Sequence, residues 1–254
     1  MNSFALVQAR SVAEASAEAR RSKSSALKAS GLDLLDLMKE GIASPDRLVN
    51  LRTVRDADLR AITTGRIGAL ASLAEIAESA DIRRSAPAIA RCCGSAATPQ
   101  LRNMATAGGN LLQRPRCWYF RNEQFVCLKR GGSMCYAVEG ENQYHAIFGD
   151  GPCYIVHPSN LAVGLMVCEG VAHLAGGSRD SLPIRELYHM PDRGIRDEAN
   201  LEQGEVITHI SYQPAQASGF YAVKAKQSFD WPLVMAAAAL DLDGKTIRRA
   251  RICA

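Results

Sequence analysis

The chain has 254 residues, of which 47% are hydrophobic and 22% charged, and its formal net charge is +4. This is the ordinary composition of a globular protein with one or two domains, so it excludes the disordered and fibrous classes. The densest basic cluster, Arg248, Arg249 and Arg251, has no interleaved aromatic residues and predicts a solvated strand face rather than a nucleic-acid site. No run approaches the roughly 18 apolar residues of a membrane span, so we also expect no membrane contact.

Residues 1–55 predict a small βαβ unit. Ser11 followed by Glu14 is typical of a capping box at a helix start, and Gly31 marks a turn after the second strand. The expected elements are a strand at 4–8, a helix at 12–21 and a strand at 26–29.

The rest of the chain mixes helices and strands, which indicates an α+β protein. Ser72 with Glu75 predicts another helix start, and Asp243-Gly244 is a favoured two-residue hairpin turn. The stretch from Gly94 is expected to be rich in loops. The expected elements are a strand at 61–64, helices from 72, at 86–93 and at 158–165, strands at 167–174 and 206–212, and hairpin strands at 233–242 and 245–253.

Two segments centred on glycines, 26–41 and 98–114, suggest a bound cofactor. Glycines let backbone amides approach a diphosphate closely, and such amides hold anions without charged side chains. Taken alone, the first segment is better explained as a left-handed turn that follows a strand.

Together and in this order, the two segments resemble the FAD-binding subunits of molybdenum hydroxylases, the xanthine dehydrogenase family. That family has Ala-Gly-Gly-Thr-Asp-Leu and, about seventy residues later, Gln-Ile-Arg-Asn-x-Ala-Thr-x-Gly-Gly-Asn-Leu. The first motif corresponds to residues 29–34 and departs from the family at Ser30 and Leu32; the second corresponds to residues 100–111 and is nearly complete. The text around the cysteines described below is most similar to the [4Fe-4S]-containing flavin subunit of bacterial three-subunit aldehyde oxidoreductases.

The resemblance covers essentially the whole chain and implies its fold. We expect an α+β, vanillyl-alcohol-oxidase-like (PCMH-type) FAD-binding fold of two α/β subdomains, followed by a CO-dehydrogenase-flavoprotein-like C-terminal domain. The first subdomain would span residues 1–58. The second would span 59–214 with an iron-sulfur insertion at 117–153, and residues 215–254 would begin a C-terminal domain that is expected to be truncated.

The resemblance also implies the FAD site. Backbone amides of residues 29–33 would hold the diphosphate, and residues 106–110 would lie near the ribityl chain and the flavin ring. Ala222 stands where many relatives have a flavin-facing lysine, which leaves Lys224 as the nearest cation or, alternatively, as an exposed strand lysine. Asn160 replaces a flavin-contacting aspartate of the family. The implied cofactor-binding residues are Leu27, Lys28, Ala29, Ser30, Gly31, Leu32, Asp33, Leu34, Thr106, Gly109, Asn110, Asn160, Ile207 and Lys224.

Four cysteines, Cys117, Cys127, Cys135 and Cys153, lie in a region of weak hydrophobic periodicity. They include no C-x-x-C pair, which excludes a zinc ribbon and a plant-type ferredoxin pattern. The insertion begins seven residues after Asn110, as in the relatives that carry a [4Fe-4S] cluster, and four thiolates suit such a cluster. The alternatives are a vestigial loop with reduced thiols, or adventitious zinc.

The remaining cysteines and histidines predict no catalytic residue. Cys92, Cys93, Cys168 and Cys253 stand in helix or strand contexts and are expected to be buried as small apolar residues. We expect His145 and His157 to form hydrogen bonds or to lie at the surface. His173, His189 and His209 show no paired spacing with one another or with carboxylates, so we find no nucleophilic triad and no metal-hydrolase motif.

The expected function is a redox relay whose chemistry belongs to its cofactors, FAD and a [4Fe-4S] cluster. The resemblance implies two partners: a large subunit that holds the molybdenum cofactor and a small subunit that holds [2Fe-2S] clusters. The competing hypotheses are an autonomous flavin oxidase of the same fold and a truncated non-catalytic remnant. The N-terminus lacks a signal-peptide pattern, so we expect a cytoplasmic location, or a periplasmic one by co-export with a signal-bearing partner.

Overall fold

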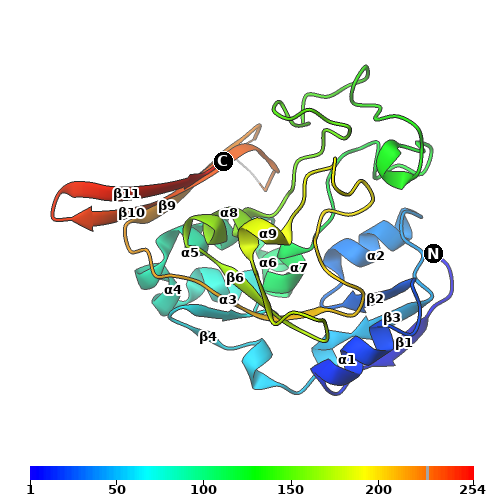
Figure 1. Cartoon of the computed structure of the whole chain (residues 1–254), viewed down its shortest axis with the longest axis horizontal. Helices are drawn as coiled ribbons and strands as arrows, with labels where there is room; N and C mark the ends of the chain where they lie inside the picture. The colour runs from blue at the N-terminus through cyan, green and yellow to red at the C-terminus, as the bar shows by residue number, and fades with distance from the viewer. Residues whose placement is uncertain (227–228) are drawn as a thin grey trace.

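The N-terminal residues form a parallel three-stranded sheet of order β1-β3-β2 in the computed structural model, which describes residues 1–226 and 229–254. Figure 1 shows this sheet and its two helices on one side of the molecule. The Ser11 hydroxyl accepts from the amide of Glu14 at 3.1 Å, so the predicted helix start and the βαβ unit are confirmed. The elements are β1 (Ala5–Gln8), α1 (Val12–Ala19), β2 (Ser25–Lys28), α2 (Leu32–Lys39) and β3 (Arg47–Asn50).

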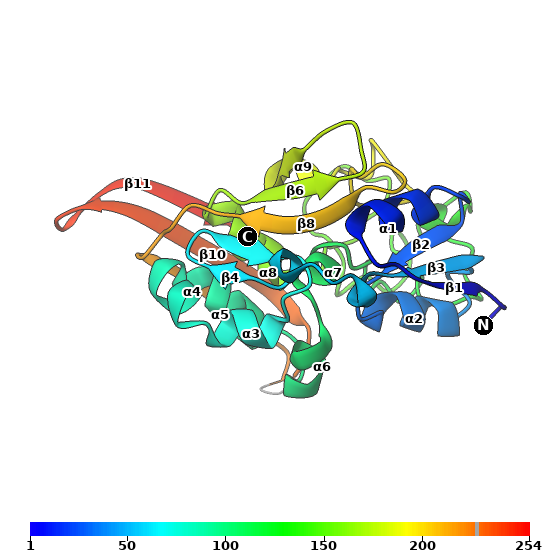
Figure 2. The ribbon, with the colours of Figure 1, turned by 90° about the horizontal axis from the view of Figure 1, so that it is seen from below.

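A second sheet has five strands in the order β4-β5-β8-β6-β7, and all its neighbouring strands are antiparallel. The view in Figure 2 shows helices α3, α4 and α5 against one face of this sheet. Its strands are β4 (Ile62–Thr63), β5 (Arg66–Gly68), β6 (Val171–Ala175), β7 (Ser181–Pro183) and β8 (Val206–Ser211). The associated helices are α3 (Leu73–Glu78), α4 (Ala80–Ser85), α5 (Pro87–Ser95), α8 (Asn160–Val167) and α9 (Ile184–Leu187). Fully buried side chains such as Ile67, Ile89 and Leu165 fill the core between sheet and helices.

Two parts of this region differ from the sequence expectation. The strand predicted at 167–174 starts only at Val171, because α8 continues to Val167 and the chain then turns through Glu169, whose φ is +52°. The stretch predicted to be rich in loops contains two short helices, α6 (Pro99–Met104) and α7 (Ala107–Leu111). Both are capped: the hydroxyls of Thr98 and Thr106 accept from the amides three residues later. Threonine caps and tertiary packing therefore outweigh the low helix propensity of two consecutive glycines.

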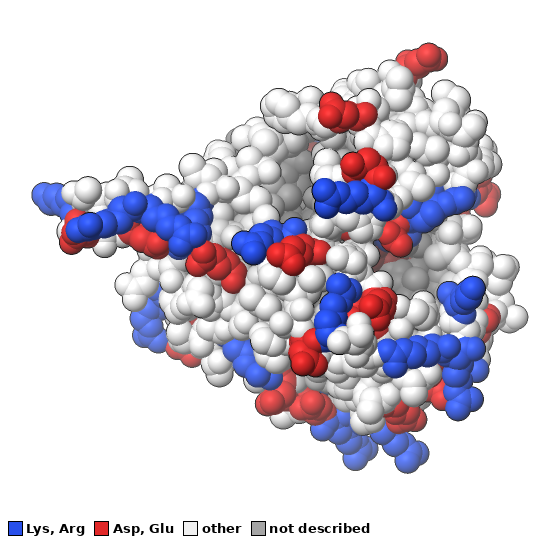
Figure 3. All heavy atoms as spheres, in the orientation of Figure 1, with Lys and Arg blue, Asp and Glu red and all other residues white. Residues whose placement is uncertain are grey.

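The last strands form a separate antiparallel sheet of order β11-β10-β9, made of β9 (Ser218–Lys224), β10 (Pro232–Asp243) and β11 (Thr246–Cys253). The predicted hairpin turn is confirmed, with Gly244 at φ +59°. This sheet packs against α5 and α8 through buried Ala237 and Ala239 and extends as an arm. Figure 3 shows Lys and Arg side chains along the arm beside acidic ones. The prediction of a solvated strand face is confirmed for Arg248 and Arg249, whose side chains are 69% and 57% exposed, but not for Arg251, which is 13% exposed and pairs with Asp241 at 2.7 Å.

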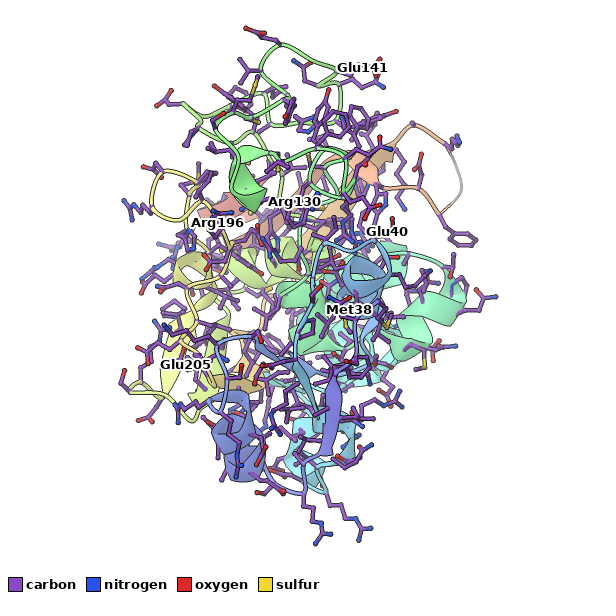
Figure 4. The ribbon with its side chains drawn as sticks, turned by 90° about the vertical axis from the view of Figure 1, so that its right-hand side faces the viewer. Met38, Glu40, Arg130, Glu141, Arg196 and Glu205 are labelled. Atoms are coloured by element: carbon purple, nitrogen blue, oxygen red, sulfur yellow. The ribbon has the colours of Figure 1, made fainter. Side chains whose placement is uncertain are left out.

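The cysteine-rich segment 117–153, here called the insertion, contains one regular element, the 3-10 helix η3 (Leu128–Arg130). Figure 4 shows Glu141 at its far end and Arg130 near Arg196 at its base. A small core of Leu37, Phe120 and Cys127 attaches the insertion to α2. Two further 3-10 turns, η1 (Leu51–Thr53) and η2 (Ala57–Leu59), connect the two sheets. Within the described ranges, no helix is long and apolar enough to cross a membrane.

Candidate functional site

A cavity of about 650 Å³ lies where the N-terminal sheet meets the unit built on the five-stranded sheet. Both glycine-centred segments line it, together with Asn160 at the start of α8 and Ile207 on β8. Of the fourteen cofactor-binding residues expected from the sequence, all but Lys224 line this cavity. Residues that are far apart in the sequence are therefore brought to one site.

The first segment enters the cavity at the end of β2 and turns into α2. Gly31 adopts φ +83°, and a Cβ atom there would lie 3.0–3.1 Å from side-chain atoms of Leu35 and Lys28. Only glycine adopts this conformation readily. The first turn of α2 follows directly, and its amide groups have no partner within the helix. This end of α2 carries the positive side of the helix dipole, which favours an anion.

The second segment places α7 against the opposite part of the cavity. The Thr106 hydroxyl accepts from the amide of Gly109 at 3.1 Å, and the Gly108 amide donates to the Ala69 carbonyl at 2.9 Å. The Ser30 hydroxyl donates to the carbonyl of Met104, so the two segments are joined directly. The two loops that line the cavity are therefore linked to each other by this hydrogen bond.

Asn160 and Lys224 converge on Ser95, which lines the cavity. The Asn160 side-chain amide donates to the Ser95 hydroxyl at 3.2 Å, and the Lys224 ammonium donates to the Ser95 carbonyl at 3.0 Å. Lys224 is half-buried and does not line the cavity. Lys224 therefore lies beside the cavity wall and is not a fully exposed strand lysine.

Several lining residues had not been expected from the sequence. Arg114 and Arg116, which follow the second motif directly, reach the cavity, and the Arg116 guanidinium lies 4.7 Å from the centre of the Trp231 ring. Burial lowers the pKa of Arg116. The signal that could have revealed these arginines is their position next to a glycine-rich cofactor motif, because a basic side chain there complements a diphosphate.

The four cysteines of the insertion line a second, small cavity. Burial raises the pKa of Cys117 and raises that of Cys153 to about 11, and neighbouring thiols add to both shifts. The imidazole Nε2 of His145 lies 3.1 Å from the Cys117 sulfur, which confirms the expected hydrogen-bonding role of His145. In the described part of the chain, no group of three or more His, Cys, Asp or Glu side chains is arranged to hold a metal ion. The four sulfurs therefore surround one cavity without forming a site for a single ion.

His173, His189 and His209 each contact another histidine or a carboxylate, although their spacing in the sequence indicated no such pairs. His173 on β6 and His209 on β8 stack with ring centres 4.1 Å apart, and His189 lies 2.8 Å from Asp197. The strand register brings His173 opposite His209 although 36 residues separate them, which sequence spacing could not reveal. As expected, Cys92, Cys93 and Cys168 are buried, whereas Cys253 is half-buried.

We expect His157 to make the protein less stable in mild acid. Burial lowers the pKa of His157 to about 4, from about 6.5 in an unfolded chain. The unfolded state thus binds a proton first, so the stability held above pH 6.5 is lost as the pH falls towards 4, by up to about 3 kcal/mol. Urea unfolding between pH 7 and 4.5 should show a shallower pH dependence for His157→Gln than for the wild type. His209→Gln should flatten it less, because that ring lies nearer to solvent; equal slopes in all three proteins would contradict the prediction.

Comparison with known proteins agrees with this geometry. Residues 2–212 match the family described as the FAD binding domain in molybdopterin dehydrogenase. The chain is 33% identical over 252 residues to the aldehyde oxidoreductase FAD-binding subunit PaoB of Escherichia coli (strain K12). The alignment covers 96% of this chain and 79% of that protein.

Solved structures show the same mixed α+β fold over nearly the whole chain. Reconstituted CO dehydrogenase from Oligotropha carboxidovorans superposes with a TM-score of 0.72 at 22% identity, covering 99% of this chain and 74% of that one. Quinoline 2-oxidoreductase from Pseudomonas putida 86 gives a TM-score of 0.69 at 18% identity, covering 98% and 72%. The family match and the PaoB identity carry the assignment: the chain belongs to the FAD-binding subunits of the molybdopterin dehydrogenase family, a family of oxidoreductases.

Proposed function

We propose that this chain is the flavin-bearing electron-transfer subunit of a molybdenum-dependent aldehyde or xanthine-type dehydrogenase. The observation that carries the proposal is the convergence of both glycine-centred segments on one 650 Å³ cavity. Electrons released at a molybdenum cofactor on a large subunit would pass through [2Fe-2S] clusters on a small subunit to this FAD, and from there to an external acceptor. The flavin supplies the electron chemistry, and the chain supplies its placement.

Residues of the cavity fit FAD by their chemistry. The amides of residues 29–33 at the start of α2 suit the diphosphate, and the positions around Thr106, Gly109 and Asn110 suit the ribityl chain and the ring. The proposed site also includes Leu27, Lys28, Leu34, Asn160 and Ile207, with Lys224 held beside it through Ser95. Neither loop contains a His or Cys side chain, so the flavin would be bound noncovalently.

We also propose that the four cysteines of the insertion ligate one [4Fe-4S] cluster. The sulfurs line one cavity, and soft thiolates are the ligands of iron-sulfur clusters. Each cysteine of a cubane binds a different iron, so the four sulfurs need not gather around one point as they must for a single zinc ion. Binding would also supply the ordering free energy that a segment with one 3-10 turn lacks.

The domain division and the location follow from the same reasoning. We assign residues 1–58 and 59–214 to the two subdomains of a vanillyl-alcohol-oxidase-like FAD-binding fold, and residues 215–254 to the beginning of a CO-dehydrogenase-flavoprotein-like domain. Such a complex would work in the cytoplasm, or in the periplasm if a partner subunit carries the export signal.

Aldehyde oxidation should require the partner subunits. In the described part of the chain we find no group that would activate a carbonyl, so the purified chain with FAD should not reduce its flavin when an aldehyde is added. Reduction of the flavin, measured as the loss of its visible absorbance, should occur only after the large and small subunits are added. Bleaching of the lone chain by aldehyde would instead identify an autonomous oxidase.

A further inference from the structure

Asp33 lines the flavin cavity, and its side chain contacts residues 114–121, here called the insertion neck. Its carboxylate accepts from the Arg114 amide at 2.8 Å and pairs with Arg116 at 2.8 Å and with Arg121 at 2.6 Å. Arg121 also pairs with Asp36 at 3.1 Å, one turn further along α2. The insertion neck is therefore fixed to the helix whose first turn lies at the proposed diphosphate site.

The ion pair between Asp33 and Arg121 is shielded from water, whereas the Asp36 side chain is 44% exposed. The Asp33 side chain is 16% exposed and that of Arg121 12%, so their interaction is screened less than that of a surface pair. Arg116 lines the flavin cavity itself, whereas Arg121 does not. Arg121 therefore acts on this site through the carboxylates that it holds and through its bonds to the carbonyls of Arg114 and Pro115.

The charge of Asp33 creates a conflict at the start of α2. A carboxylate in the first turn competes with an anionic ligand for the positive end of the helix and repels it. The Arg114 amide and the two guanidinium groups offset that charge, so the same turn can accept a diphosphate. Without the insertion neck, Asp33 would be left as an uncompensated negative charge beside the ligand.

We propose that the insertion neck controls flavin affinity by neutralising Asp33. When residues 114–121 are folded against α2, the first turn of the helix accepts the FAD diphosphate; when the neck detaches, the free carboxylate repels it. Asp33 and Arg121 are thus positioning residues that make flavin binding depend on the state of the cysteine insertion, and by linkage flavin binding favours a folded neck. This inference rests on the proposed binding of FAD.

The test measures FAD binding to the full chain by quenching of flavin fluorescence. Arg121→Gln should raise the dissociation constant roughly 10-fold, because Asp33 loses a charged partner. Asp33→Asn removes the repelling charge together with the need for its partner, so the double variant Asp33→Asn with Arg121→Gln should recover most of the lost affinity. A role in stability alone gives no such rescue, since two losses of packing do not cancel.

A matched control separates charge neutralisation from general loosening of the insertion. Arg130 lies in the insertion, and within the described residues its side chain donates to the carbonyls of Asn122 and Phe125 and to no cavity-lining group, so Arg130→Gln should leave FAD affinity unchanged. Equal weakening by Arg130→Gln and Arg121→Gln, or a double variant no better than Arg121→Gln, would overturn the inference. Failure of the wild-type chain to bind FAD would instead overturn the proposed function.

Discussion

Gly109→Val should yield a folded chain that binds FAD about 5- to 150-fold more weakly than the wild type. Gly109 lies in α7 at the cavity wall, and a Cβ atom there would lie 2.9 Å from the Thr106 hydroxyl oxygen. Two further methyl groups would extend into space that the cofactor needs. Overpacking costs about 1–3 kcal/mol, which corresponds to a loss of affinity of about 5- to 150-fold. Loss of the Thr106 cap adds about 1 kcal/mol of destabilisation, which a thermal melt measures separately.

The same substitution at Gly94 is the control for Gly109→Val. Gly94 lies on the exposed side of α5, where a Cβ atom would meet only Ala77 at 3.7 Å, and it does not line the cavity. Gly94→Val should leave the stability of the helix nearly unchanged, because valine has a slightly higher helix propensity than glycine, and should leave the yellow chromophore intact. Full flavin content in purified Gly109→Val would show that the cofactor does not lie against α7.

Cys117→Ser should remove most of the iron from the protein. Chain prepared without oxygen should contain about four irons, as a cubane cluster requires. Serine is a poor ligand for soft iron, so loss of one ligand should abolish most of the broad visible absorption and make residues 117–153 more sensitive to proteases. Iron analysis and absorbance spectra of the Cys117, Cys127, Cys135 and Cys153 variants provide the measurement.

The buried cysteines outside the insertion provide the comparison. Cys92 is fully buried in α5, and its sulfur lies beside Gly164 of α8. Cys168 is the C-cap residue of α8. Cys92→Ser and Cys168→Ser should cost stability without changing the iron content. Iron-free wild-type protein, zinc in place of iron, or equal iron loss from Cys92→Ser and Cys117→Ser would show that the insertion is not a cluster site.

Local sequence signals predicted those elements whose stability is itself local. The Ser11 cap needs a hydroxyl three residues before its partner amide, and the hairpin at Gly244 needs a residue that tolerates positive φ, so both can be read from neighbouring residues. The cavity lining was anticipated because a motif resemblance fixed both loops. The sequence could not predict the stacking of His173 on His209 or the pairing of Asp33 with Arg121. Strand register and tertiary packing bring those residues together.

The chain segments on either side of the insertion are joined by a hydrogen bond. The Asn110 side-chain oxygen accepts from the Ser159 hydroxyl at 2.8 Å, and both Arg116 and Pro158 line the flavin cavity. Closing a loop of this length costs only about 2 kcal/mol more than closing a turn of about five residues. During evolution such a module can be gained, exchanged or deleted while the surrounding scaffold keeps its shape, so a flavin subunit could acquire a redox centre without redesigning its framework.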